Sequence, residues 1–258
     1  MSLARTTSSL IGHAERTVGP ALAQEVADYL SLATDVTDAA GELIERVQQA
    51  PGDPRAIHAC AFLLARLVTD LNAVAHLIRL GYVAPALSLT AGMLEMAHTC
   101  MFIGADEERA GKWLSHDDTK IAAPWRIYDI IQDVARHIDV RSDIAKREWD
   151  VIYRTACMAK HGNPLAFKQV GFVERGNERF ILAGPYSSRD VSAWAHMTLG
   201  YAIRYTKLAS LKFIIDHVGA TQERDELYRR WRELGDRQHQ LAAADVASFG
   251  ASDMPDVG

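Results

Sequence analysis

Hydrophobic residues recur at three- and four-residue intervals along most of this chain, and that spacing predicts amphipathic helices. A first helical run is expected over about residues 20–50. A Pro-Gly-Asp-Pro turn ends this run, with Asp53 placed as the N-cap residue of the next helix and Pro54 at its first position. The second helix is expected to continue until Gly81 stops it.

A third helix is expected over residues 84–103. It is apolar on nearly every side, which predicts a position at the centre of a helical bundle. Further helices are expected at residues 106–115, 124–138, 142–161, 190–217 and 221–244. Only one stretch predicts β structure, a small hairpin near residues 170–182. The expected fold class is therefore all-α, a bundle of about seven or eight helices with a small β-hairpin insertion.

The same patterns predict one structural domain. No repeat of fixed period is visible, and no linker separates two halves of different composition. Residues 1–18 are expected to form an N-terminal extension and residues 19–246 a single helical domain. Residues 247–258 are rich in Gly, Asp, Ser and Pro, and we expect them to form a disordered tail.

Charge and cysteine content narrow the classes of partner. The 258 residues contain 28 Lys and Arg against 33 Asp and Glu, a formal net charge of −5, so nucleic acid would need a local basic site. Three cysteines without a CxxC pair favour a reducing cytosol. The N-terminus lacks the apolar core of a signal peptide, and Glu95 interrupts the most apolar stretch. We therefore expect a cytoplasmic protein without a membrane partner.

Motif searches predict no cofactor. The phosphate-binding loop, the dinucleotide fingerprint, the nucleophile elbow and the common zinc and calcium spacings are all missing from the sequence, and no DNA-binding motif stands out. Glu95 and His98 form an ExxH pair, as in di-iron bundles, but the chain has no second ExxH. Buried, hydrogen-bonded polar residues are the simpler interpretation of this pair, and a metal-binding helical oxidoreductase remains a third hypothesis.

The sequence near residue 160 carries a more specific candidate. Arg154 and His161 are seven residues apart, which places both side chains on one stripe of a helix, with Lys160 beside them. A histidine transfers protons near neutral pH and an arginine holds phosphate, so these side chains could cleave RNA without a metal ion. Lys168 could extend the basic patch. Cleavage also needs an acid, which a second copy in a symmetric homodimer would supply.

This element resembles the Arg-x(4–6)-His signature of HEPN domains. The wider sequence resembles DUF5677-type helical proteins, which are often discussed beside HEPN-like bundles. The residues that carry this second resemblance are Gly81, Tyr82, Ala86, Glu95, Tyr153, His161 and Gly162. The resemblance covers about residues 55–215. It implies a helical bundle, frequently dimeric, found in toxin, defence and RNA-processing settings, with some members acting as metal-independent RNases and others as inactive binding modules.

A non-catalytic alternative assigns structural roles to the same residues. His161 could stabilise a helix C-terminus through the helix dipole. Arg154 could pair with a nearby carboxylate, from Glu148, Asp150 or Glu95. Tyr153 and Glu95, with His98, could form a polar network inside the bundle. The chain would then be a dimeric interaction or scaffold module.

Overall fold

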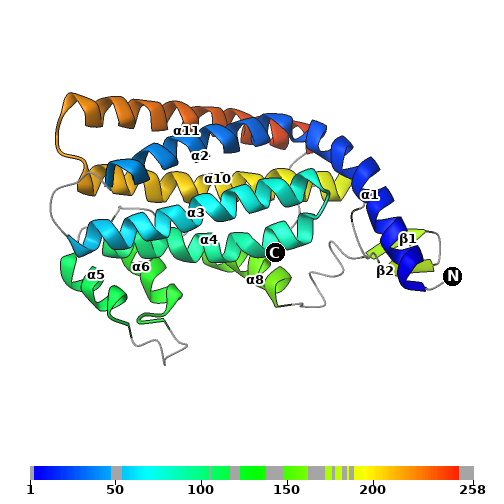
Figure 1. Ribbon diagram of the computed structural model, residues 1–258, viewed down its shortest axis with the longest axis horizontal. Coiled ribbons are helices and arrows are strands. Elements are labelled where there is room, and N and C mark those ends of the chain that lie inside the picture. The colour runs from blue at the N-terminus through cyan, green and yellow to red at the C-terminus, as the bar shows by residue number, and fades with distance from the viewer. Residues whose placement is uncertain are drawn as a thin grey trace.

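The computed structural model describes residues 3–47, 54–104, 106–116, 123–137, 148–161, 172–175, 178–181, 185 and 189–249. These residues form an all-α bundle, as predicted from the helical periodicity (Figure 1). The helices are α1 (Leu3–Glu25), α2 (Ala27–Val47), α3 (Arg55–Arg79), α4 (Val83–Ile103), α5 (Glu107–Leu114), α6 (Ile127–His137), the π-helical η1 (Glu148–Tyr153), α8 (Arg154–Lys160), α10 (Arg189–His217) and α11 (Gln222–Phe249).

The number of helices is slightly higher than predicted. The described residues contain nine α-helices and one π-helix, against the expected seven or eight. One reason is that the run expected over residues 20–50 is split. Val26 separates α1 from α2, although its backbone N–H still donates to the carbonyl of Leu22 and its own carbonyl accepts from Leu30. The first 18 residues, expected as an extension, are helical from Leu3 onward.

Two short strands accompany the helices. β1 (Phe172–Arg175) and β2 (Glu178–Ile181) pair antiparallel, with Phe172 opposite Ile181. Residues 170, 171, 176, 177 and 182 of the predicted hairpin lie outside the described residues. At the other end of the chain α11 extends to Phe249, past the predicted domain boundary at residue 246.

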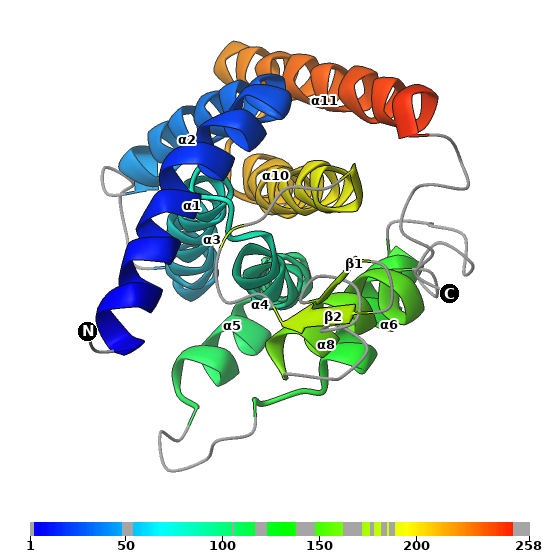
Figure 2. The ribbon, with the colours of Figure 1, turned by 90° about the vertical axis from the view of Figure 1, so that its right-hand side faces the viewer.

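The apolar helix α4 lies at the centre of the bundle, as predicted. It packs against α3 and α10 on one side and against α6 and α8 on the other (Figure 2). Met93, Leu94 and Ile103 are completely buried. Gly81 adopts a φ of 86°, a left-handed conformation that lets the chain turn sharply from α3 into α4.

By length and composition alone, α3 and α4 are also apolar enough to cross a membrane. In this structure 44% of the relevant window of α3 and 56% of that of α4 are buried inside the protein. The central helices of soluble proteins have the same composition, so this property does not decide between the two environments.

The last helix, α11, docks along α2 and α10 through a narrow apolar stripe. Leu227, Trp231 and Leu234 form this stripe, and Trp231 is completely buried. Ion pairs to α2 flank the stripe and join Arg230 to Glu42, Arg237 to Asp35 and Arg46 to Glu223. The apolar stripe is therefore buried against helices of the same chain, and the charged faces of α11 remain at the surface.

Helix α1 crosses the end of α3 so closely that only glycine fits at one position. A Cβ added at Gly19 would lie 2.5 Å from the backbone carbonyl oxygen of Arg79, which cannot move aside as a side chain can. A Cβ at Gly41 of α2 would meet nothing within 4 Å. These two helical glycines therefore differ in the space around them, although the substitution by alanine is chemically the same.

We predict that Gly19→Ala and Gly41→Ala change stability in opposite directions. Gly19→Ala should lower the free energy of unfolding by about 1–3 kcal/mol, because the new methyl group forces α1 away from α3. Gly41→Ala should raise it by about 0.5–1 kcal/mol, because alanine is the better helix former. Urea denaturation monitored by circular dichroism measures both values. Equal effects of the two substitutions would contradict the close approach of α1.

Candidate functional site

The predicted Arg-His element lies where η1 continues into α8 on the surface of α4. Three aromatic side chains run along this region. The ring of Trp149 stacks on that of Tyr153 at a centroid distance of 4.7 Å, and Tyr128 meets Trp149 edge-on at 5.1 Å. Tyr128 is 46% exposed, so the aromatic row begins at the surface and ends against the bundle.

A hydrogen bond between α4 and η1 places α8. The hydroxyl of Tyr153 donates to Oε1 of Glu95 over 2.8 Å. Partial burial and the carboxylate of Glu95 raise the pKa of Tyr153 well above its usual value, so the phenol remains a donor at physiological pH. The structure thus brings together two of the three residues of the predicted polar network.

The third member, His98, makes its contacts elsewhere. Its Nδ1 lies 3.0 Å from the carbonyl oxygen of Leu94 in the same helix, and its ring faces Tyr205 at 6.4 Å. Among the described residues, no group of three or more His, Cys, Asp or Glu side chains is arranged to hold a metal ion. In the described part of the chain, Glu95 therefore accepts a hydrogen bond from η1, and His98 makes one within α4.

The cationic side chains of the predicted site are at the surface. Arg154, Lys160 and His161 are all exposed. The backbone N–H of His161 donates to the carbonyl of Cys157 over 2.9 Å, and His161 itself ends α8 as its C-cap residue, with a φ of −98° and a ψ of 11°. At seven residues the two side chains of the Arg-His pair differ by about 20° around the axis and about 10 Å along it.

Arg154 forms no ion pair with any described carboxylate. Glu95, one of its proposed partners, instead accepts the hydroxyl of Tyr153. The side chain of Glu148 and the whole of Lys168 lie outside the described residues. We call these three exposed side chains, Arg154, Lys160 and His161, the α8 patch; Arg154 and His161 share one stripe of α8, and Lys160 lies about 120° around the helix from Arg154, on the side of Cys157.

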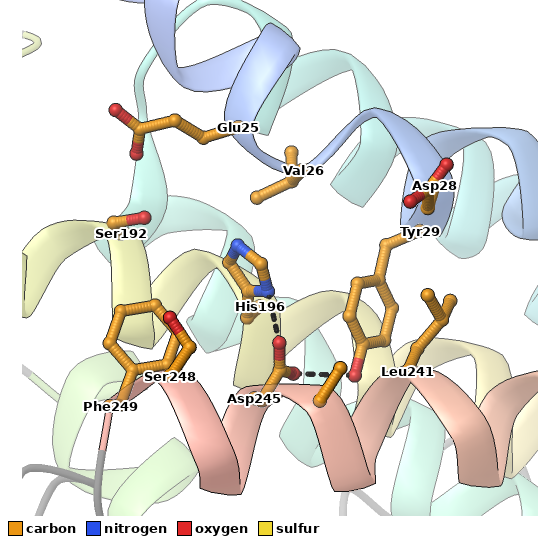
Figure 3. A pocket seen from close by; sticks show the side chains of 11 residues that line it. Glu25, Val26, Asp28, Tyr29, Ser192, His196, Leu241, Asp245, Ser248 and Phe249 are labelled. Atoms are coloured by element: carbon orange, nitrogen blue, oxygen red, sulfur yellow. Dashed lines mark hydrogen bonds and ion pairs between the residues drawn. The ribbon is translucent and has the colours of Figure 1, made fainter.

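A second candidate site, not found from the sequence, lies between α2, α10 and α11 (Figure 3). The carboxylate of Asp245 joins two partners there. Its Oδ1 lies 2.7 Å from Nδ1 of His196, and its Oδ2 accepts the hydroxyl of Tyr29 over 2.6 Å. All three side chains border a cavity of about 650 Å³, a volume typical of small-molecule sites.

Burial and the neighbouring carboxylate give Tyr29 a fixed role in this cluster. Both effects raise the pKa of the phenol far above its usual value, so Tyr29 stays protonated and donates to Asp245. The ring of His196 is enclosed edge-on by Tyr29 at 5.4 Å and by Phe249 at 5.3 Å. The imidazole is therefore held both by a hydrogen bond and by packing.

The spacing of apolar residues along α11 could have indicated Asp245. The buried stripe continues from Leu234 through Leu241 to Phe249, in steps of three or four residues, and Asp245 lies on it. A carboxylate on a buried face needs hydrogen-bond partners. The helix predicted from the sequence ends at residue 244, so Asp245 lies just outside it. Nothing local pointed to His196 as the partner, because it lies 49 residues away.

Comparisons with known proteins found no match to this chain. No protein-family model matches the chain, no curated protein matches it and no solved structure matches it. The roles assigned to the two sites therefore depend on the geometry and chemistry described above.

The bond between Tyr153 and Glu95 gives a stability prediction with a pH signature. Tyr153→Phe should lower the free energy of unfolding by about 1–2 kcal/mol at neutral pH, because Glu95 loses its donor. The unfolded tyrosine ionises near pH 10 whereas the folded one keeps its proton, so its contribution is complete below about pH 10 and is lost as pH rises above that value.

The variant should therefore lose less stability than the wild type between about pH 9 and pH 11. Urea denaturation across this range measures both effects. Tyr128→Phe is the matched control, because its ring is half-exposed and its hydroxyl makes no hydrogen bond with the described residues. Equal losses in the two variants would show that the bond to Glu95 does not stabilise the fold.

Proposed function

We propose that this chain is a helical-bundle protein of the DUF5677-like or HEPN-like type, and that it binds and cleaves single-stranded RNA at the α8 patch without a metal ion. The observation that carries the proposal is the exposure of Arg154, Lys160 and His161 on one short element, with no described carboxylate paired to Arg154. A purely structural arginine is expected to have a partner, whereas a phosphate-binding one is expected to be open to solvent.

Each residue of the patch has a step in the proposed reaction. The imidazole of His161 takes the proton of the RNA 2′-hydroxyl, and the 2′-oxygen attacks the adjacent phosphorus. Arg154 and Lys160 neutralise the negative charge that develops on the phosphoryl oxygens. The bond from phosphorus to the 5′-oxygen then breaks. The products are a 2′,3′-cyclic phosphate and a 5′-hydroxyl end.

The leaving 5′-oxygen needs a proton that the first His161 does not carry at that moment. In this proposal a second, protonated His161 donates it from another copy of the chain, so the active form is a homodimer with two patches facing one cleft. A monomeric mass in solution, measured by light scattering at the assay concentration, would contradict this part of the scheme.

The aromatic row beside the patch supports a single-stranded substrate. Unpaired bases stack on exposed aromatic rings, and the gain is about 1–3 kcal/mol per base. Tyr128 offers such a ring, and Trp149 and Tyr153 extend the row toward Arg154. The bond from Tyr153 to Glu95 would hold this row and the patch in one orientation.

We predict that the purified protein cleaves single-stranded RNA in the presence of EDTA and leaves cyclic-phosphate ends. His161→Ala should lower the cleavage rate at least about 100-fold, the usual contribution of a general acid or base. Its melting temperature should stay close to that of the wild type, because the side chain is exposed. His239→Ala, at another exposed histidine on α11, is the matched control and should cleave normally.

Arg154→Gln tests the role of phosphate binding separately. It should weaken RNA binding and also reduce the dependence of affinity on salt, because each phosphate contact to a single strand contributes about −0.7 to the slope of log K against log salt. With the two cationic side chains of Arg154 and Lys160, the magnitude of the wild-type slope should not exceed about 1.4. Fluorescence anisotropy with a labelled oligoribonucleotide measures this slope.

One result would favour the scaffold alternative over cleavage. If the wild type never cuts RNA, and His161→Ala lowers only the melting temperature, the residues of the α8 patch are structural and the chain is an interaction module. In that case Tyr128→Ala tests RNA binding by itself. If the wild type binds RNA without cleaving it and this variant loses that affinity, RNA binding is the function.

A further inference from the structure

The cavity beside His196 and Asp245 is a second site, separate from the α8 patch. It opens between the end of α1, the first turn of α2, the start of α10 and the end of α11. Helix α8 packs on α4, and α10 lies between α4 and the layer formed by α2 and α11 (Figure 2). The proposed RNA chemistry uses no residue of this cavity.

The orientation of His196 defines what the cavity offers a ligand. Nδ1 of the imidazole is committed to Asp245, and the other ring nitrogen points away from Asp245 toward the side where Val26 and Ser192 lie (Figure 3). A carboxylate can only accept, so Nδ1–H donates to Asp245 and Nε2 is the ring nitrogen left for a ligand. No described residue hydrogen-bonds to Nε2, so this nitrogen is open to the cavity.

The charge of the lining selects the class of ligand. The described residues of the lining contribute three carboxylates, from Glu25, Asp28 and Asp245, and no lysine or arginine. Glu25 and Asp28 are exposed at the rim, whereas Asp245 is buried. A phosphate or carboxylate ligand would be repelled here. A ligand that donates hydrogen bonds and carries positive charge would find acceptors at the two rim carboxylates, whereas both oxygens of Asp245 already bond to His196 and Tyr29.

The apolar walls of the cavity favour a cationic ligand that carries an aliphatic chain. The cavity is also lined by Val26, Leu241 and the rings of Tyr29 and Phe249, and Val26 lies between Glu25 and His196 (Figure 3). Apolar surface of this kind accommodates methylene groups, and the aromatic faces attract ammonium groups. A neighbouring cavity of about 350 Å³ shares Tyr29, His196 and Asp245 but includes Arg204 and Lys207, so a cation is expected only on the acidic side.

We propose that the cavity binds a small aliphatic amine of the polyamine class. One ammonium group lies near Nε2 of His196, and the methylene chain runs past Val26 on the side to which Nε2 points (Figure 3). A second ammonium group reaches the carboxylate of Glu25, and Asp28 adds negative charge at the rim. This function is independent of RNA cleavage, and it explains why a histidine and an aspartate are held so closely on the border of an open cavity.

The test is isothermal titration calorimetry of the full chain with spermidine and putrescine at fixed ionic strength. Saturable binding with one site per chain is the expected result. The double variant Glu25→Gln, Asp28→Asn should bind at least about tenfold more weakly, which corresponds to about 1.4 kcal/mol. The double variant Asp225→Asn, Glu226→Gln removes the same charge at the other end of α11 and should bind as the wild type does.

A second measurement reports on the imidazole directly. In ¹⁵N-labelled protein the ring resonances of His196, assigned by their loss in His196→Gln, should shift when spermidine binds. Three results would overturn the proposal: no saturable binding at millimolar amine, equal weakening in both double variants, or binding of inorganic phosphate instead. None of these results bears on the α8 patch, whose test uses RNA and variants of α8.

Discussion

The burial of α4 is the constraint on which the other elements depend. This helix has no polar face wide enough to meet water, and each large apolar side chain that it buries contributes about 2 kcal/mol. The surrounding helices are therefore arranged to cover it, α3 and α10 on one side and the shorter α6 and α8 on the other. Its few polar groups are satisfied locally, as when the hydroxyl of Thr90 donates to the carbonyl of Leu87.

The position of the α8 patch follows from this arrangement. Since η1 and α8 cover α4, Tyr153 comes within reach of Glu95, and the arginine, lysine and histidine of α8 and its C-cap are exposed to solvent. The layer formed by α2, α10 and α11 is held differently. Trp231 anchors α11 by its apolar stripe, and the exposed ion pairs to α2, each worth less than about 1 kcal/mol, act mainly on register.

Local periodicity predicted the helices well because the spacing of apolar residues directly reflects which face of a helix is buried. The same information predicted the central position of α4, since this depends on one strongly patterned segment. It does not determine the contact of Tyr153 with Glu95, which joins residues 58 positions apart and depends on how η1 packs on α4. It could not place the break at Val26, where the apolar pattern continues unchanged. It also could not bring His196 to Asp245, because that contact depends on how α10 and α11 pack.

The contact between Tyr29 and Asp245 joins residues that are 216 positions apart. One wall of the acidic cavity thus comes from the first fifth of the chain and another from its last helix. During synthesis the parts of α2 and α10 that α11 covers stay exposed until α11 has left the ribosome, although both helices can already pack on α3. The cavity therefore forms only after the C-terminal helix has packed against the earlier part of the bundle.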